Sequence, residues 1–107
     1  MKGSGFMSVV KVNINNFEEI RGSEKQVLLD FYADWCGPCR MVSPVVDEIA
    51  KENPQLLVGK INVDEEPELA QKFGVSSIPM LVAMKNGEII GKSVGAKPKA
   101  QILALLK

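Results

Sequence analysis

Two cysteines, Cys36 and Cys39, have the residue type and spacing best suited to chemistry, and both lie in the segment WCGPC. They are the only cysteines in a sequence of 107 residues that contains no histidine. Two thiols three positions apart can bind a metal, close a structural disulfide or exchange electrons with another disulfide. The rest of the sequence decides among these three uses.

A metal site is disfavoured by the number of ligands. A structural zinc site needs four ligands, normally Cys or His, and the chain offers two Cys and no His. Arg40 directly after Cys39 does not fit the Cys-X-X-Cys-His pattern of haem attachment, and an iron–sulfur cluster needs more thiols. We therefore expect no metal and no bound cofactor.

A purely structural disulfide is the second alternative. Closing so short a loop removes little entropy from the unfolded chain. Such a bridge is also rarely maintained in a reducing cytosol. We therefore regard a permanent structural bridge as the weaker interpretation of this pair.

A redox role agrees with the local structure that the sequence predicts. The segment VLLDFYA (27–33) is apolar almost throughout, which is typical of a buried strand, and a helix is expected from the cysteines to about Glu52. A thiolate at a helix N-terminus is stabilised by unpaired backbone N–H groups and by the helix dipole. We expect Cys36 to attack an external disulfide and Cys39, one turn later on the same face, to resolve the mixed disulfide.

The other elements follow from hydrophobic periodicity and from turn residues. The long helix has an apolar stripe that includes Met41, and Pro44 inside it predicts a kink. The remaining expected elements are an edge strand over 9–14, a helix over 16–22 that begins at an asparagine cap, a strand over 56–63, a helix over 67–74, strands over 80–85 and 88–94 joined by a tight Asn-Gly turn, and a helix over 97–107.

This order, β-α-β-α-β-α-β-β-α, predicts an α/β fold: a central mixed five-stranded sheet flanked by four helices. Strands separated by helices are expected to run parallel, and the hairpin is expected to add an antiparallel edge. The length favours a single domain over 1–107, in which residues 1–7 are interpreted as a leader or an appended remnant.

The charge balance and the absence of long apolar runs indicate which partners and which compartment to expect. Thirteen basic and thirteen acidic residues give a net charge of zero without a dense basic stripe, so nucleic acid is not expected as a partner. No apolar run approaches the roughly 20 residues that span a bilayer, and the N-terminus lacks the apolar run of a signal peptide. We expect a cytoplasmic protein without a membrane partner.

Three segments together resemble the thioredoxin family over nearly the whole chain from about Val9. They are DFYADWCGPC (30–39), GKINVDEEPELAQKFGVSSIPMLVAMKNGE (59–88) and SVGA (93–96). The resemblance implies the thioredoxin fold and a general protein disulfide reductase that transfers electrons and maintains cell redox homeostasis. It also implies that Gly37 and Pro38 tune the redox potential.

The resemblance assigns further roles to matching positions. Asp30 matches a buried carboxylate that assists proton transfer to and from Cys39, and burial is expected to raise its pKa toward neutrality. Lys60 matches a lysine near that carboxylate, although the sequence alone favours an ordinary surface lysine. Pro79 matches a cis-proline that faces the cysteines and lets the backbone at Ile78 lie beside an extended substrate.

The residues expected to form a flat substrate surface are Trp35, Gly37, Pro38, Ile78, Pro79, Gly95 and Ala96. The resemblance implies thioredoxin reductase as electron donor, ribonucleotide reductase or peroxiredoxins as targets, and a monomer. Three residues depart from common family choices, namely Tyr32, Met80 and Met84, and Met80 is expected to affect partner preference at the substrate edge. A dedicated exchanger with a narrow partner set and a non-catalytic clamp subunit remain as alternatives.

Overall fold

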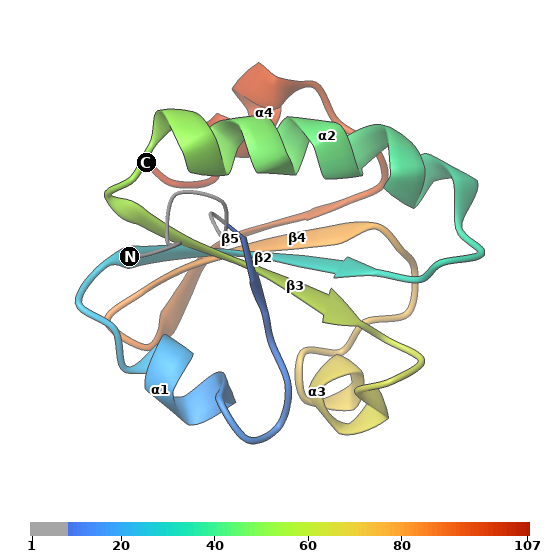
Figure 1. Ribbon diagram of the computed structural model, residues 1–107, viewed down its shortest axis with the longest axis horizontal. Coiled ribbons are helices and arrows are strands. Elements are labelled where there is room, and N and C mark those ends of the chain that lie inside the picture. The colour runs from blue at the N-terminus through green and yellow to red at the C-terminus, as the bar shows by residue number, and fades with distance from the viewer. Residues whose placement is uncertain (1–8) are drawn as a thin grey trace.

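The computed structural model describes residues 9–107 and has the element order that the sequence predicts (Figure 1). The interpretation of residues 1–7 as a leader lies outside the described residues. The elements are β1 (Val9–Lys11), α1 (Phe17–Arg21), β2 (Gln26–Tyr32), α2 (Gly37–Glu52), β3 (Leu56–Asn62), α3 (Pro67–Lys72), β4 (Met80–Lys85), β5 (Glu88–Val94) and α4 (Lys99–Ala104). None of the helices within this range is long and apolar enough to cross a membrane.

The five strands form one mixed sheet in the order β1-β3-β2-β4-β5. Strands β1, β2 and β3 are parallel, whereas β4 is antiparallel to β2 and β5 is antiparallel to β4. The expectation that all helix-separated strands run parallel is therefore wrong for β4. Helix α3 has six residues, about 9 Å at the usual rise, and lies at the end of the sheet where β3 finishes (Figure 1). The chain consequently re-enters the sheet from the end that it left.

Helices α2 and α4 cover one face of the sheet, and α1 and α3 cover the other (Figure 1). Alternating side chains of β2 separate the two cores: Phe31 packs among residues of α1 and α3, whereas Leu28 packs under α2 and α4. Because side chains alternate along a strand, Asp30 points to the same face as Leu28. The fold therefore places one carboxylate beneath the long helix that begins at the cysteines.

The edges of the elements show where local side chains override the hydrophobic pattern. Strand β1 ends at Lys11 and not at the expected Ile14, because the Asn13 side chain accepts hydrogen bonds from the backbone N–H groups of Asn15 and Asn16 and turns the chain. Asn16 is the N-cap residue of α1, but its side chain does not cap the helix. Helix α4 is limited to the middle of the expected range, with Pro98 at its N-cap.

The predicted hairpin turn is confirmed. Asn86 has φ 54° and Gly87 has φ 80°, and β4 and β5 pair directly on either side of them. Two consecutive positive φ angles are the requirement of the tight turn that Asn-Gly favours. The prediction of a single long helix through Pro44 is also confirmed, since α2 runs without interruption from Gly37 to Glu52.

Candidate redox-active site

Cys36 is the N-cap residue of α2. Its backbone is extended, with φ −90° and ψ 111°, and its sulfur accepts a hydrogen bond of 3.2 Å from the backbone N–H of Cys39. A thiolate at this atom receives the hydrogen bonds and the dipole that an N-cap side chain normally receives. Pro38 lies in the first turn, where a missing N–H leaves no helical hydrogen bond unmade.

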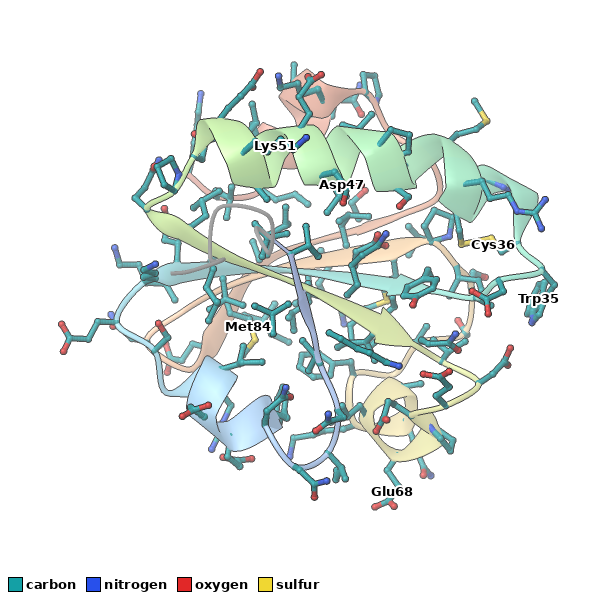
Figure 2. The ribbon with its side chains drawn as sticks, viewed as in Figure 1. Trp35, Cys36, Asp47, Lys51, Glu68 and Met84 are labelled. Atoms are coloured by element: carbon teal, nitrogen blue, oxygen red, sulfur yellow. A yellow bond between two sulfur atoms is a disulfide. The ribbon has the colours of Figure 1, made fainter. Side chains whose placement is uncertain are left out.

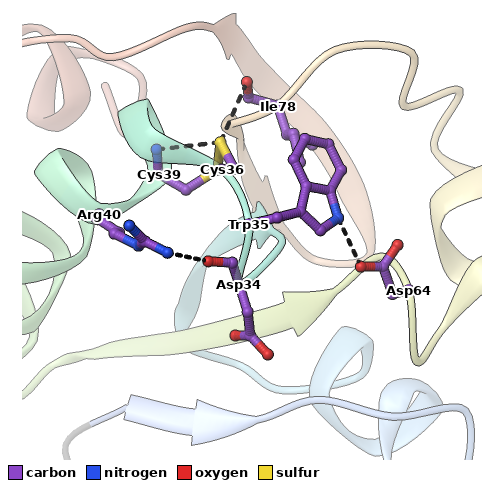
Figure 3. The surroundings of a disulfide bond; sticks show 7 residues. All are labelled: Asp34, Trp35, Cys36, Cys39, Arg40, Asp64 and Ile78. Carbon is purple, nitrogen blue, oxygen red and sulfur yellow. Dashed lines mark hydrogen bonds between the residues drawn. A yellow bond between two sulfur atoms is a disulfide. The ribbon is translucent and has the colours of Figure 1, made fainter.

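The two cysteines form a disulfide in this structure (Figure 3). Their Cα atoms are 5.3 Å apart, and Cys36 and Cys39 are only 4% and 3% exposed. Access to the sulfurs is therefore narrow, and the surrounding surface controls which disulfides approach them.

The loop before β4 lies against the disulfide. The carbonyl oxygen of Ile78 is 3.9 Å from the sulfur of Cys36 (Figure 3), and the Ile78–Pro79 peptide bond is cis. The backbone N–H of Gly95, which has φ 92°, donates a hydrogen bond of 2.7 Å to the carbonyl of Pro79. The fold thus brings Ile78 and Pro79, and Gly95 from a later part of the sequence, to the thiols.

The expected substrate surface is only partly exposed. Trp35, Gly37, Pro38 and Ala96 are exposed, and Ile78 and Gly95 are half-buried. Pro79 is buried, so it shapes the loop and does not present a contact surface of its own.

Met80 was expected to affect partner preference at the substrate edge, and the structure corrects this expectation; Met84, the other methionine that departs from the common family choice, lies in the same core. Both side chains are 3% exposed and belong to the core between the sheet and helices α1 and α3. Strand alternation turns the Met80 side chain away from α2, so it cannot contact a partner at the substrate edge.

Trp35 stands out from the surface at this end of the sheet. It is 69% exposed, and its indole N–H donates a hydrogen bond of 2.9 Å to a carboxylate oxygen of Asp64 (Figure 3). Figure 2 shows Trp35 and Cys36 together at one end of the molecule. Sequence reasoning missed Asp64, although the signal was present: it follows β3, whose carboxyl end lies beside that of the parallel strand β2.

Met41 was placed in the buried stripe of α2, and this prediction is wrong. Its side chain is 70% exposed, because the buried face of α2 runs through Val42, Val46 and Ile49 and Met41 is turned about 100° around the helix from Val42. Together with Val42, Ala96, Lys97 and Pro98 it lines a hollow of about 250 Å³. A largely apolar hollow therefore lies between the first turns of α2 and the segment that follows β5.

Asp30 is buried, as predicted. It is 1% exposed, and neither carboxylate oxygen has a hydrogen-bond partner within residues 9–107. Burial raises the pKa of Asp30 to about 6; nearby Lys60 partly opposes this rise and Asp47 adds to it. A carboxyl group of this kind exchanges its proton close to neutral pH, as a proton acceptor for a thiol requires.

Lys60 is paired with Asp30 in the register of β2 and β3. Its side chain is partly buried, in contrast to an ordinary surface lysine. The ammonium donates a hydrogen bond to the hydroxyl of Ser43 on α2 and lies 5.3 Å from the centre of the Tyr32 ring. A cavity of about 320 Å³ is lined by Cys39, Ser43 and Lys60, together with Tyr32, Ala33, Asp34 and Arg40. Arg40 also donates a hydrogen bond of 2.8 Å to the carbonyl of Asp34 (Figure 3).

A thiol at a helix N-cap, a second thiol one turn later and a buried carboxyl group on the adjacent strand define a thiol–disulfide oxidoreductase. Within the described range, no group of three or more His, Cys, Asp or Glu side chains is placed to hold a metal ion. The site therefore has the parts that thiol–disulfide exchange needs.

Comparison with known proteins identifies the family. The thioredoxin family model matches residues 8–107. A thioredoxin from Pyropia yezoensis is 47% identical over 102 residues, covering 94% of this chain and 95% of its own length. A bifunctional thioredoxin reductase/thioredoxin from Mycobacterium leprae (strain TN) is 49% identical over 88 residues, covering 81% of this chain and 19% of its own length.

The solved structure of a mutant thioredoxin from Halobacterium salinarum NRC-1 superposes with a TM-score of 0.85 at 36% identity, covering 92% of this chain and 87% of its own. The chain belongs to the thioredoxin family. It has the thioredoxin fold, and its activity is that of a protein disulfide reductase. The alternatives of a narrow exchanger and a non-catalytic clamp are not favoured.

Proposed function

We propose that the protein reduces disulfides of other proteins with Cys36 as the attacking thiol and Cys39 as the resolving thiol. The observation that carries this assignment is the position of Cys36 at the N-cap of α2, where its sulfur accepts the Cys39 N–H. The same N–H stabilises a thiolate at Cys36 and offers nothing to the sulfur of Cys39. The two thiols therefore differ in nucleophilicity.

The first step is attack on the target. The Cys36 thiolate bonds to one sulfur of the substrate disulfide, the substrate S–S bond breaks, and the departing thiolate takes a proton from water. The product is a mixed disulfide between Cys36 and the substrate. This step needs no cofactor because the electrons come from the protein thiols.

The second step releases the substrate. Cys39 gives its proton to the carboxylate of Asp30, and the resulting thiolate attacks the sulfur of Cys36. The mixed disulfide breaks, the second substrate thiolate leaves, and it takes up a proton that Asp30 returns through the surrounding water. Two electrons and two protons have then passed to the substrate, and the Cys36–Cys39 disulfide of this structure is the oxidised product. Lys60, paired with Asp30 across the strands, moderates its charge.

Substrate contacts come from the exposed apolar surface around the pair. The half-buried residue Ile78 offers its backbone to an extended chain, buried Pro79 shapes the loop, and Trp35, Gly95 and Ala96 flank it. Gly37 and Pro38 are exposed between the two cysteines and, in our proposal, set the redox potential. This shallow surface suits many substrates and selects them weakly.

The oxidised protein needs an electron donor, and thioredoxin reductase is the proposed partner. The relative from Mycobacterium leprae, named as a bifunctional thioredoxin reductase/thioredoxin, supports this pairing. We further propose a monomeric electron carrier in the cytoplasm that serves enzymes which form disulfides in turnover, such as ribonucleotide reductase and peroxiredoxins.

Reduction of insulin disulfides by excess dithiothreitol tests the proposed function. The wild-type protein should accelerate the reaction strongly, whereas Cys36→Ser should match the uncatalysed rate because the activated thiol at the helix N-cap is lost and the Cys39 thiol lacks that activation. Ser93→Ala, a change on β5 away from the thiols, serves as a folded control with wild-type activity. A wild-type rate equal to the rate without protein would refute the proposal.

A further inference from the structure

Ser43 is a polar residue of α2 that the proposed reaction has not used. It follows Cys39 by four positions, so both side chains lie on one face of the helix. Both line the same cavity of about 320 Å³. The hydroxyl of Ser43 accepts a hydrogen bond from the ammonium of Lys60, which joins α2 to β3 at the wall of that cavity.

This hydrogen bond determines where the ammonium of Lys60 lies. Within residues 9–107, Lys60 forms no ion pair with a carboxylate, Asp30 included. Its other close neighbour is the ring of Tyr32, at 5.3 Å. A lysine ammonium is compact and strongly hydrated on a flexible stem, so without the hydroxyl it would turn from the cavity toward water.

The position of this ammonium affects Asp30 because few charges face that carboxylate. Lys60 faces it from β3 and Asp47 from α2, and these two have opposite effects on its ionisation. Tyr32 follows two positions later on β2 and points to the same face. On the other side, the register places the uncharged Leu81 of β4 next to Asp30 and Ser93 of β5 beyond it.

We propose that Ser43 is a positioning residue for proton transfer: its hydroxyl holds the Lys60 ammonium in the cavity beside Cys39, where the positive charge favours the ionised form of Asp30. This proposal rests on the proposed function, in which the Asp30 carboxylate accepts the Cys39 proton. Ser43 does not touch the reacting sulfurs and acts through Lys60. Loss of the hydroxyl weakens the stabilisation of the carboxylate and leaves less of it ready to accept a proton at slightly acid pH.

The test compares Ser43→Ala with Ser43→Thr, which keeps the hydroxyl. The reduced protein is mixed with 5,5′-dithiobis(2-nitrobenzoate), and release of the coloured thiolate is followed by stopped flow between about pH 5 and pH 8, a range that brackets the titration of Asp30. The first phase reports attack by Cys36, and the second reports resolution by Cys39. Failure of the first phase in the wild type would count against the proposed function, whereas the Ser43 proposal concerns only the pH profile of the second phase.

In Ser43→Ala, we expect the midpoint of the second-phase profile to move to higher pH. Near pH 6 the rate should fall about threefold, the size expected from a partly screened charge interaction. Ser43→Thr should retain the wild-type midpoint. Lys60→Met should produce a similar displacement, and combining it with Ser43→Ala should add nothing further, because both changes remove the same charge from the cavity.

A carboxyl ¹³C titration of Asp30 in the oxidised protein provides a second readout that does not depend on turnover. Its midpoint should rise in Ser43→Ala and stay at the wild-type position in Ser43→Thr. Superimposed wild-type and Ser43→Ala titrations would overturn the proposal. A displacement to lower pH would also overturn it, since that would mean that the released ammonium moves toward Asp30.

Discussion

The buried carboxylate of Asp30 should destabilise the folded protein at neutral pH, and Asp30→Asn should remove this effect. Burial raises the pKa of Asp30 from an ordinary 3.8 to about 6. The folded protein therefore holds this proton more tightly than the unfolded chain does. The free energy of unfolding consequently decreases as the pH rises from about 4 to about 7, by about 3 kcal/mol for a difference of roughly two pH units.

Asparagine has nearly the same shape as aspartate and does not titrate in this range. Relative to the wild type, Asp30→Asn should gain about 3 kcal/mol of unfolding free energy between about pH 4 and pH 7, and the gain should level off above that range. Urea unfolding of the oxidised proteins measures this difference without interference from free thiols.

Asp34→Asn is the matched control, because Asp34 is an exposed carboxylate in the loop that leads to the cysteines. Its unfolding free energy should follow the wild-type profile across the same pH range. A constant difference between Asp30→Asn and the wild type at all pH values would refute the reasoning, because it would show that Asp30 titrates alike in the folded and unfolded chains.

Two further predictions concern the kinetics and the packing. Asp30→Asn should slow the resolution of the mixed disulfide by about a hundredfold above about pH 6, which is the lower end of the effect of losing a general base. The difference from the wild type should shrink at lower pH, where the wild-type carboxyl is protonated. An equal rate in both proteins at pH 8 would contradict this role. Gly59→Ala should cost about 1–3 kcal/mol in urea unfolding, because an added Cβ would lie 2.5 Å from a methyl carbon of Val12. Gly37→Ala, where no atom lies within 4 Å of the new carbon, should stay within about 0.5 kcal/mol of the wild type, and equal losses in the two variants would contradict the packing argument.

The parts of the fold that local sequence determines were predictable. Asn86 and Gly87 specify their turn through their own backbone preferences. The apolar residues around Asp30 required a strand covered on both faces, and this is why its burial could be anticipated. The helix N-terminus at Cys36 likewise followed from the change of hydrophobic period after β2.

The parts that depend on how elements meet in space were not predictable in the same way. The direction of β4 depends on where α3 lies relative to the sheet, which strand patterns do not encode. Met41 has the spacing of a core residue but lies to one side of the buried face that Val42 and Val46 form. The hydrogen bond between Ser43 and Lys60 joins residues 17 positions apart, and neither residue type predicts the other.

The central claim is the unequal division of labour between the two thiols, and trapping of the mixed disulfide tests it most directly. Reduced Cys39→Ser and reduced Cys36→Ser are each mixed with a disulfide-bonded protein such as insulin, and covalent complexes are counted by intact mass spectrometry. Cys39→Ser should accumulate a complex linked through Cys36, because attack proceeds and resolution does not, whereas Cys36→Ser should form little. Accumulation in Cys36→Ser but not in Cys39→Ser would contradict the assignment of attacker and resolver.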